Sequence, residues 1–344
     1  MKRKFLVSMV TVFVFFAVTV MVNGVSLAAE KPIKWRCQTL WPMASPSFAT
    51  SALTLSKKLE ARTGGRLQVE MFPAGSLMPS GDIFKAVQMG MLEMGAVAPE
   101  YFITQVPLGE IGSGIPFNFK ETWECVYFYR WLGFEEMLRK ACVKNGVYYA
   151  TDSIFSTELV TTKPIVKMDD FKGLKLRSAG SMQSYFDSIG AAANYIPGGE
   201  VYSALSSGVI NGAHWGNALG NASMKLYEIG KFHLRTPLRY SGVAGWILNV
   251  KTMEKLPKDI QEIIITTLNE EFWLKTNQYE YMAMKKINEL EATGVKMTQF
   301  SDAEYNAMQK AAVPIWDKIA AKDPLNAEAI KIIKDFNRSM GRLK

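Results

Sequence analysis

The alternation of apolar and polar positions divides most of the chain into short strands and amphipathic helices. Ser45-Pro46 begins the first helix and Gly64-Gly65 ends it, as expected for a proline start and a glycine stop. A repeating strand–helix order of this kind predicts a parallel sheet with helices packed on it. The predicted elements are strands at 34–40, 67–72 and 93–98 and helices at 45–62 and 79–89.

The remaining pattern predicts a second group of strands and a long helix. One helix is expected over 121–144, and strands at 147–152 and 158–162 lead out of the first group. A helix from 258 to about 293 would be long enough to lie across two lobes. Further elements are a strand ending at Arg177, a strand ending in His214-Trp215, a returning strand at 243–250, and helices at 301–321 and 326–340.

The N-terminus has the pattern of an export signal. Lys2-Arg3-Lys4 is followed by an apolar run over 5–22 and by the small residues of Ser26-Leu27-Ala28. We therefore expect residues 1–29 to be a signal peptide and the protein to be periplasmic. An uncleaved anchor helix is the competing interpretation, because the apolar run is long for a signal.

About 315 residues would remain after cleavage, more than one hydrophobic core usually serves, so two lobes are expected. The predicted fold is α/β, with a cleft between the lobes and strands that cross between them. Lobe I is expected to comprise residues 30–160 with returning segments at about 245–344. Lobe II is expected to comprise residues 161–244.

Charge and cysteine content narrow the function. The formal charge of +8 falls to 37 − 32 = +5 without residues 1–28, which hold three basic and no acidic residues. That excess suits an anionic solute, and the scattered basic residues argue against nucleic acid. Of the three cysteines, Cys125 and Cys142 could pair, or Cys37, Cys125 and Cys142 could all be buried apolar residues.

Arg177 is the principal candidate for ligand binding. It stands at the end of an apolar strand, at the sheet edge where ligands bind in open α/β folds. A guanidinium there can hold a carboxylate through two hydrogen bonds, although a salt bridge between lobes is the structural alternative. Trp215 would pack on the carbon skeleton of the ligand, and Asn217 offers two donors and one acceptor.

Other candidates have stronger structural alternatives. Tyr101 would offer its hydroxyl from lobe I, and His214 would either contact the carboxylate or form a structural hydrogen bond. Trp41, Phe155 and Trp246 are expected to be pocket walls or core residues.

Several motifs, in this order, give the chain a resemblance to the periplasmic substrate-binding subunits of TRAP transporters. They are Gly65-Arg66-Leu67, Phe72-Pro73-Ala74-Gly75, Gly173-Leu174-Lys175-Leu176-Arg177, the run at 199–205 and the run at 208–212. The resemblance implies the two-lobe fold of type II-like binding proteins, an organic-acid ligand and a membrane permease as partner. It also implies a possible homodimer through the C-terminal helices.

Four further motifs resemble the branch that binds 2-oxo and 2-hydroxy acids. They are Trp41-Pro42, Ala98-Pro99-Glu100-Tyr101, Pro197-Gly198-Gly199-Glu200 and His214-Trp215. That branch, as the resemblance implies, holds the carboxylate partly through a cation bound by one Gln and two Glu residues. Here Ser156, His214 and Gly245 stand at those positions, which leaves too few oxygen ligands for Na⁺ or Ca²⁺. We therefore expect no metal and no cofactor, and a carboxylate held by Arg177, Ser156 and His214.

Two other functions compete with this interpretation. A secreted hydrolase would need an activated nucleophile, but the chain has no GxSxG motif and only His214 and His233 as possible histidine bases. No phosphate loop, zinc motif or nicotinamide fingerprint is present, so no catalytic residue is expected. A binding module that serves a sensor instead of a transporter would have the same pocket, and the sequence does not separate the two.

Overall fold

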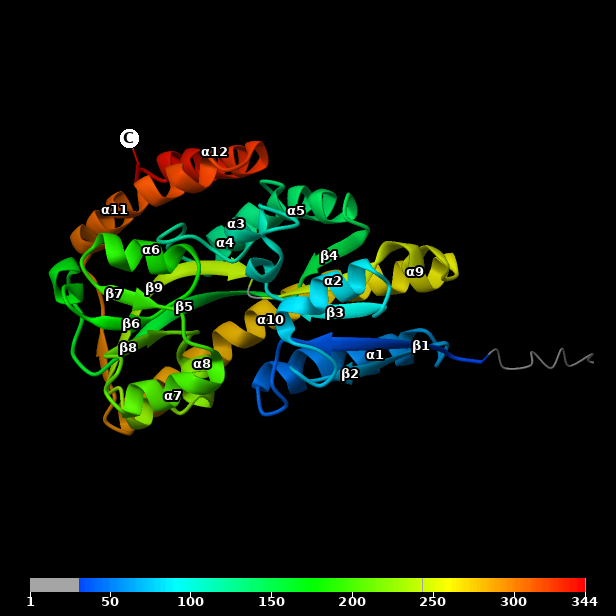
Figure 1. The fold of residues 1–344 in the computed structure, drawn as a ribbon, viewed down its shortest axis with the longest axis horizontal. Helices are drawn as coiled ribbons and strands as arrows, with labels where there is room; N and C mark the ends of the chain where they lie inside the picture. Colours follow the sequence, from blue (N-terminus) through cyan, green and yellow to red (C-terminus); the bar gives the residue numbers. More distant parts are fainter. Residues whose placement is uncertain (1–30, 243, 344) are drawn as a thin grey trace, which may run out of the picture. The chain divides into compact units, whose positions relative to one another are not determined.

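Two β-sheets organise the protein (Figure 1). The structure, a computed structural model, describes residues 31–242 and 244–343. The predicted signal peptide at 1–29 lies outside these residues. Pro32–Lys344 form one contact unit, in which both sheets lie.

The first sheet has the strand order β2-β1-β3-β10-β4. β1 (Ile33–Thr39) pairs in parallel with β2 (Leu67–Phe72) and β3 (Met94–Val97), as the sequence predicts. β10 (Gly245–Asn249) is antiparallel to both β3 and β4 (Val147–Thr151), so the returning strand lies inside this sheet.

The second sheet has the order β11-β9-β5-β8-β6-β7. β6 is parallel to β7 and β8, whereas β5 is antiparallel to β8 and β9. A bulge interrupts the β5–β9 ladder between Thr157 and Leu159. The strands are β5 (Ile154–Thr161), β6 (Lys175–Arg177), β7 (Ala192–Asn194), β8 (Gly212–His214), β9 (Phe232–Gly242) and β11 (Lys296–Thr298).

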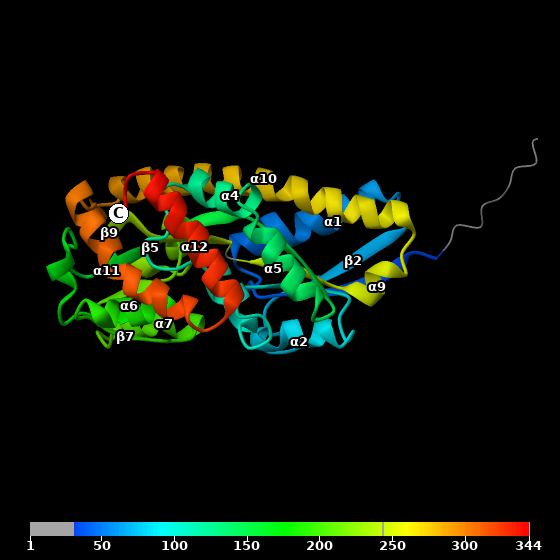
Figure 2. The same cartoon turned by 90° about the horizontal axis from the view of Figure 1, so that it is seen from above.

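Helices cover both sheets (Figure 2). Most of them are short. The α-helices are α1 (Thr54–Arg62), α2 (Ile83–Gln88), α3 (Gly109–Gly112), α4 (Thr122–Arg130), α5 (Phe134–Val143), α6 (Ser181–Ser188), α7 (Gly198–Ser206), α8 (Ala218–Ser223), α9 (Val250–Glu254), α10 (Lys258–Ala292), α11 (Asp302–Ala320) and α12 (Pro324–Ser339). A π-helix η1 (Phe48–Leu53) precedes α1, and 3₁₀ turns occur at η2 (Ser80–Asp82), η3 (Pro99–Phe102), η4 (Met168–Phe171) and η5 (Leu226–Glu228).

The single helix predicted over 121–144 is wrong. α4 ends at Arg130 and α5 begins at Phe134, after Gly133 with φ of 84°. A left-handed backbone breaks the run of helical hydrogen bonds, and glycine adopts it without a steric penalty. The apolar periodicity continues across the break, which explains why the pattern alone suggested one helix.

The chain crosses between the sheets at two neighbouring places. Thr151 pairs with Gly245 in the first sheet, while Ile154 pairs with Gly242 in the second. α10 is a third connection, because it contacts α1 and β4 on one side and α8 and β5 on the other (Figure 1). The crossing strands and the long helix shared by both parts are thus as the sequence predicts.

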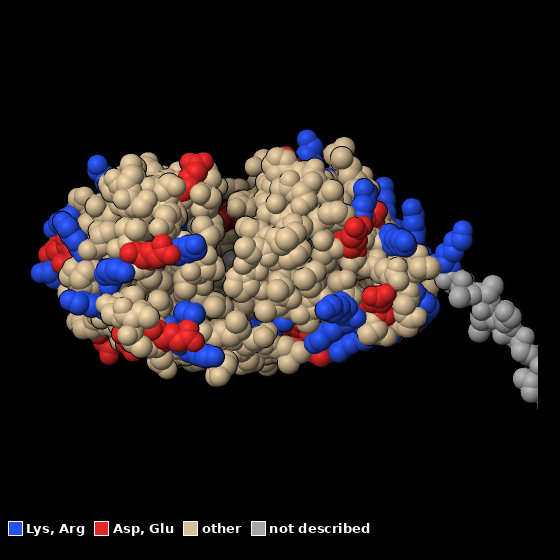
Figure 3. Space-filling view, turned by 90° about the horizontal axis from the view of Figure 1, so that it is seen from below, with Lys and Arg blue, Asp and Glu red and all other residues tan. Residues whose placement is uncertain are grey.

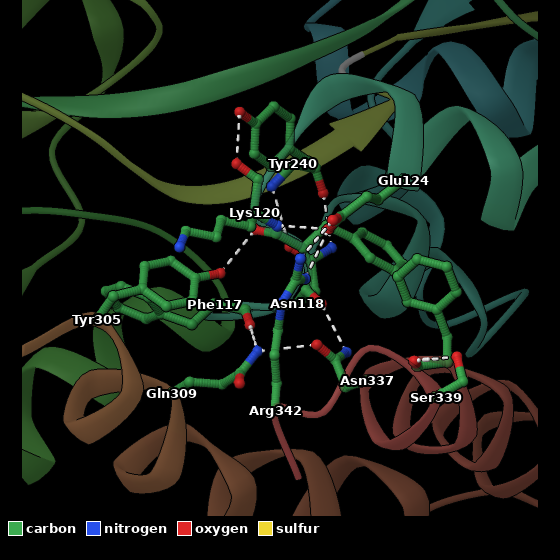
Figure 4. Close-up of polar contacts among 12 residues, drawn as sticks. Phe117, Asn118, Lys120, Glu124, Tyr240, Tyr305, Gln309, Asn337, Ser339 and Arg342 are labelled. Atoms are coloured by element: carbon green, nitrogen blue, oxygen red, sulfur yellow. Dashed lines mark hydrogen bonds and ion pairs between the residues drawn. The ribbon is translucent and has the colours of Figure 1, made fainter. Parts of the chain in front are cut away.

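The two C-terminal helices are tied to the segment that precedes α4 (Figure 4). Gln309 of α11 donates to the carbonyl of Phe117 at 3.0 Å, and Asn337 of α12 donates to the carbonyl of Asn118 at 2.9 Å. Asn118 in turn exchanges two hydrogen bonds with the backbone of Tyr240 in β9. This buried network holds the backbone of β9 at Tyr240, the residue next to Arg239.

The cysteines are buried and unpaired. Cys37, Cys125 and Cys142 are all free thiols, so the alternative of a Cys125–Cys142 disulfide is not realised. Burial raises the pKa of each thiol above its ordinary range. These cysteines therefore pack as small apolar residues.

Candidate binding site

Arg177 ends strand β6, where two backbone carbonyls orient its guanidinium. Nε donates to the carbonyl of Ile196 at 3.1 Å, and Nη1 donates to the carbonyl of His214 at 2.7 Å. Only 7% of the residue is exposed, and burial lowers its pKa, an effect opposed by the carboxylate of Glu100. Within the described residues, Nη2 has no hydrogen-bond partner. The guanidinium is thus held in place with one face of its donor set still available.

Trp215 forms the floor beneath this guanidinium. Its ring centroid lies 4.6 Å from Cζ of Arg177, and the ring of Tyr195 lies 5.7 Å from the same atom. The ring also packs on Gly198, where a Cβ would lie 2.3 Å from the edge of the indole. A residue other than glycine would displace Trp215, so Gly198 permits this cation–π stack.

A second buried arginine, which the sequence analysis did not identify, lies on β9. Arg239 is 8% exposed, and its Nε donates to Thr157 Oγ1 at 3.3 Å while Nη1 donates to the carbonyl of Gly114 at 3.3 Å. Its Nη2 lies 3.9 Å from Glu100 Oε2, too far for a hydrogen bond. Burial lowers the pKa of Arg239, and Glu100 opposes that shift.

Glu100 and Tyr101 approach these arginines from the turn after β3. Glu100 Oε2 is buried and makes no hydrogen bond within the described part of the chain. Tyr101 is 37% exposed, and burial together with Glu100 and Tyr195 raises its pKa to about 12, although Arg177 opposes the shift. Tyr101 therefore keeps its proton at neutral pH and can act as a donor. The first-sheet turn and the second sheet meet at this point.

His214 lies behind the guanidinium, and both of its ring nitrogens contact hydroxyl groups. Nε2 is 2.7 Å from Thr157 Oγ1 and Nδ1 is 3.4 Å from Ser178 Oγ. Burial, together with the charges of Arg239 and Arg177, lowers the pKa of His214 well below its ordinary value. The ring is therefore neutral, and it positions the Thr157 hydroxyl, which also accepts from Arg239 Nε.

Ser156 and Asn217 also have partners inside the protein. Ser156 donates to Glu158 Oε1 at 2.9 Å. Asn217 caps α8, since its Oδ1 accepts the N–H groups of Leu219 and Gly220 at 3.1 and 3.2 Å. The amide nitrogen of Asn217 has no hydrogen bond to any described residue, so the predicted ligand contact of this side chain stays a prediction.

The aromatic candidates fall in different surroundings. Trp41 and Trp246 pack edge to face at 5.7 Å in the core of the first sheet, and Trp246 is 1% exposed. Phe155 is half-buried, and its ring lies 6.0 Å from that of Tyr279 in α10. Among the described residues, none of these three rings makes a cation–π contact with Arg177 or Arg239, whereas Trp215 packs on Arg177.

The residues at the three cation-ligand positions do not fit a cation. The hydroxyl of Ser156 and both nitrogens of His214 are already engaged, and Gly245 packs against Tyr149, where a Cβ would lie 2.0 Å from the ring. In the described part of the chain, no three His, Cys, Asp or Glu side chains are grouped to hold a metal ion.

A narrow hollow separates the side of the molecule that carries α7 and α8 from the side that carries β1 and β2 (Figure 3). Lysine and arginine are scattered over the outer parts of this face and are sparse along the rim of the hollow. Within residues 31–242 and 244–343, no helix combines the length and apolar character needed to span a bilayer.

Known proteins resemble the chain over almost its whole length. It is 26% identical over 329 residues to a monocarboxylate 2-oxoacid-binding periplasmic protein of Nostoc sp., covering 92% of this chain and 88% of the relative. It is 27% identical over 290 residues to a C4-dicarboxylate-binding periplasmic protein of Rhodobacter capsulatus, covering 80% and 82%.

Solved structures show the same fold. A TRAP transporter solute-binding protein from Bordetella bronchiseptica superimposes with a TM-score of 0.79 at 22% identity, covering 90% of this chain and 93% of the other. That protein is described as a mixed-occupancy dimer with calcium and picolinate in one site. The two-lobe α/β fold of TRAP periplasmic binding proteins is therefore also the fold of this chain.

The family described as bacterial extracellular solute-binding protein, family 7, matches residues 38–323, which include both buried arginines and every strand except most of β1. Its members bind solutes and are not enzymes. On this match, the chain belongs to that family of extracellular solute-binding proteins.

Proposed function

We propose that the protein is the extracytoplasmic solute-binding component of a TRAP transporter and captures an organic monocarboxylate through Arg177. The observation that carries this proposal is the state of the Arg177 side chain. Two carbonyls fix its orientation, Trp215 supports its face, and Nη2 remains without a partner in the described residues. A preorganised guanidinium of this kind binds a carboxylate without first paying for its own ordering.

The relatives favour an organic acid and differ in the number of carboxylates. The Nostoc relative is named for monocarboxylate 2-oxo acids, and the Rhodobacter relative for C4-dicarboxylates. We favour the monocarboxylate class, of the 2-oxo acid type, because the Nostoc match covers more of both chains. We also propose that binding needs no cation, since Ser156, His214 and Gly245 offer no suitable ligand set.

We further propose that residues 1–29 direct export to the periplasm and that the loaded protein delivers its ligand to TRAP membrane permease subunits. A homodimer through α11 and α12 is also part of the proposal; the Bordetella structure is described as a dimer, without naming the elements that form it. A receptor feeding a sensor would use the same pocket. Uptake by reconstituted permease subunits, with and without this protein, separates the two functions.

Calorimetric titration of the purified protein with pyruvate and 2-oxobutanoate tests the binding step. Arg177→Ala should weaken the binding of either acid at least thirtyfold, or about 2 kcal/mol, because the carboxylate loses its charged partner. Arg62→Ala removes the same charge from α1, where Arg62 pairs with Glu270, and should leave affinity unchanged.

Titrations with and without Na⁺ and Ca²⁺ complete the test. Equal affinity in both conditions is expected. An unchanged affinity in Arg177→Ala, or binding that requires a cation, would contradict the proposed site.

A further inference from the structure

Three buried or half-buried charges meet where the first-sheet turn η3 faces the second sheet. We define Arg177, Arg239 and Glu100 as the arginine cluster. Arg177 comes from β6, Arg239 from β9 and Glu100 from η3. Glu100 Oε2 lies 3.9 Å from Arg239 Nη2, and its charge also acts on Arg177.

Each member of the arginine cluster has one polar atom without a hydrogen bond in the described chain. Each arginine uses Nε and Nη1 on a backbone carbonyl or on Thr157, while neither Nη2 has a hydrogen bond among the described residues. Glu100 Oε2 is buried without a hydrogen-bond partner among the described residues. A buried acceptor without a hydrogen bond is costly unless a further molecule satisfies it, and the two Nη2 groups still have donors for such a molecule.

The charge of the cluster is also incomplete. Two guanidinium groups and one carboxylate give 2 − 1 = +1. A ligand with one negative charge neutralises this site, whereas a ligand with two leaves one uncompensated anion beside Glu100. An uncompensated charge in a closed, buried site is strongly unfavourable.

We infer that Arg239 is a second ligand-facing cation and that Glu100 sets the charge of the ligand, so that the site accepts monocarboxylates and rejects dicarboxylates. This inference rests on the proposed function, since it assumes that Arg177 binds a carboxylate. In this inference Glu100 selects the charge of the ligand and does not merely pair with Arg239. A hydrogen-bonded pair with Arg239 would have used the unpaired Oε2, which instead stays 3.9 Å away.

The test compares two ligands that differ only in charge and one group. 2-Hydroxybutanoate ends in a methyl group where malate carries a second carboxylate. Calorimetry should show that the wild-type protein binds 2-hydroxybutanoate at least tenfold more tightly than malate. Glu100→Gln keeps the size of the side chain, raises the cluster to +2, and should shift the ratio of the two affinities at least tenfold towards malate.

A matched control and a rescue make the result specific. Glu60→Gln removes the same charge from α1, where Glu60 accepts from Gln68, and should leave the ratio unchanged. Arg239→Gln lowers the cluster to 0 and should weaken 2-hydroxybutanoate at least tenfold. Combining it with Glu100→Gln restores +1 and should recover at least threefold of that loss, which a damaged fold would not do.

The possible results distinguish a failure of the proposed function from a failure of the role given to Glu100. If the wild-type protein binds 2-oxobutanoate but neither of these two acids, the inference is overturned and the proposed function stands. If it binds none of the three, the proposed function is wrong as well. If the wild-type protein binds 2-hydroxybutanoate but Glu100→Gln leaves the preference unchanged, only the role of Glu100 is refuted. A wild-type preference for malate, or no recovery in the double variant, also overturns the inference.

Discussion

The arginine cluster and the surroundings of Asp152 are two buried charged regions. They differ in whether their polar atoms find hydrogen-bond partners within the protein. Asp152 Oδ1 accepts from Trp246 Nε1 at 3.0 Å, and Oδ2 accepts from Ser51 at 3.2 Å and Ser153 at 2.9 Å. Both carboxylate oxygens of Asp152 therefore have donors from the protein itself. In the arginine cluster, two nitrogens and one oxygen remain without partners in the described chain.

The difference distinguishes a structural charge from a binding charge. Asp152 lies where the chain crosses between the sheets, and its N–H also donates to the carbonyl of Ala244 at 3.0 Å. A fully satisfied network of this kind holds the two crossings together. In the proposed site, a bound ligand would supply the hydrogen-bond partners that the arginine cluster lacks. Variants in the first region should therefore change stability, and variants in the second should change affinity.

Trp246→Ala is the strongest test of this division. The substitution empties a large volume in the first-sheet core and leaves Asp152 without one donor, so the free energy of unfolding should fall by about 3–5 kcal/mol. Affinity for 2-oxobutanoate, measured on the folded fraction, should stay within about twofold of wild type. Trp246→Phe keeps most of the ring and removes only the indole donor, so it should cost less. A large loss of affinity in Trp246→Phe would instead place this residue in the pocket wall.

Asp152 should also make stability depend on pH. Burial raises its pKa from 3.8 to about 6, so the folded state holds a proton that the unfolded chain has already released. A folded pKa above the unfolded value means that this contribution grows as pH falls from about 6 towards 4 and is lost as pH rises through 6. Between pH 7.5 and 5 the gain should be about 1 kcal/mol.

Chemical denaturation of the wild-type protein and of Asp152→Asn at both pH values isolates this contribution. The asparagine variant should lack it, while other titrating groups contribute equally to both proteins. An identical change of unfolding free energy with pH in both proteins would show that Asp152 does not titrate in this range.

Sequence patterns were most informative where local and global signals agree. β2 was predicted with its observed bounds, and the helix predicted from 258 to about 293 is α10 (Lys258–Ala292). Arg177 was predicted at the end of its strand, and the structure places it there. In each case three signals favour the same element. They are the apolar periodicity, the flanking glycine or proline, and the packing.

Arg239 shows why part of the site could not be predicted. β9 contains Pro237 and a bulge opposite Glu158, so its polar and apolar residues do not alternate as in a regular strand. The burial of Arg239 depends on Gly114 and Thr157, which come from distant parts of the chain. An arginine four residues after Arg235 was visible, but nothing local shows that it turns inward.

The tryptophans show a choice that the sequence left open. Trp41, Trp215 and Trp246 have similar sequence contexts near strand ends, and all three were expected to line the pocket or the core. In the structure only Trp215 lies under a guanidinium, whereas Trp41 and Trp246 pack on each other. Which side of a sheet a residue faces depends on strand pairing. The pairing of β10 with β3 and β4 joins residues between 94 and 154 positions apart, such as Gly245 with Thr151 and Leu248 with Met94.

Asn217 combines a structural role with a predicted binding role, and its substitution should have the smallest effect on stability of the variants considered. Its Oδ1 caps α8, so Asn217→Ala should cost about 1 kcal/mol of stability, whereas Asn217→Asp keeps the acceptor and should preserve it. The amide nitrogen, unpaired in the described chain, is lost in both variants. If it binds the ligand, as the sequence suggests, both variants should weaken 2-oxobutanoate, and aspartate should do so more strongly because it adds a negative charge. Equal affinity in all three proteins would make Asn217 a purely structural cap and would leave Arg177, Arg239 and Trp215 as the proposed binding groups on this side of the cleft.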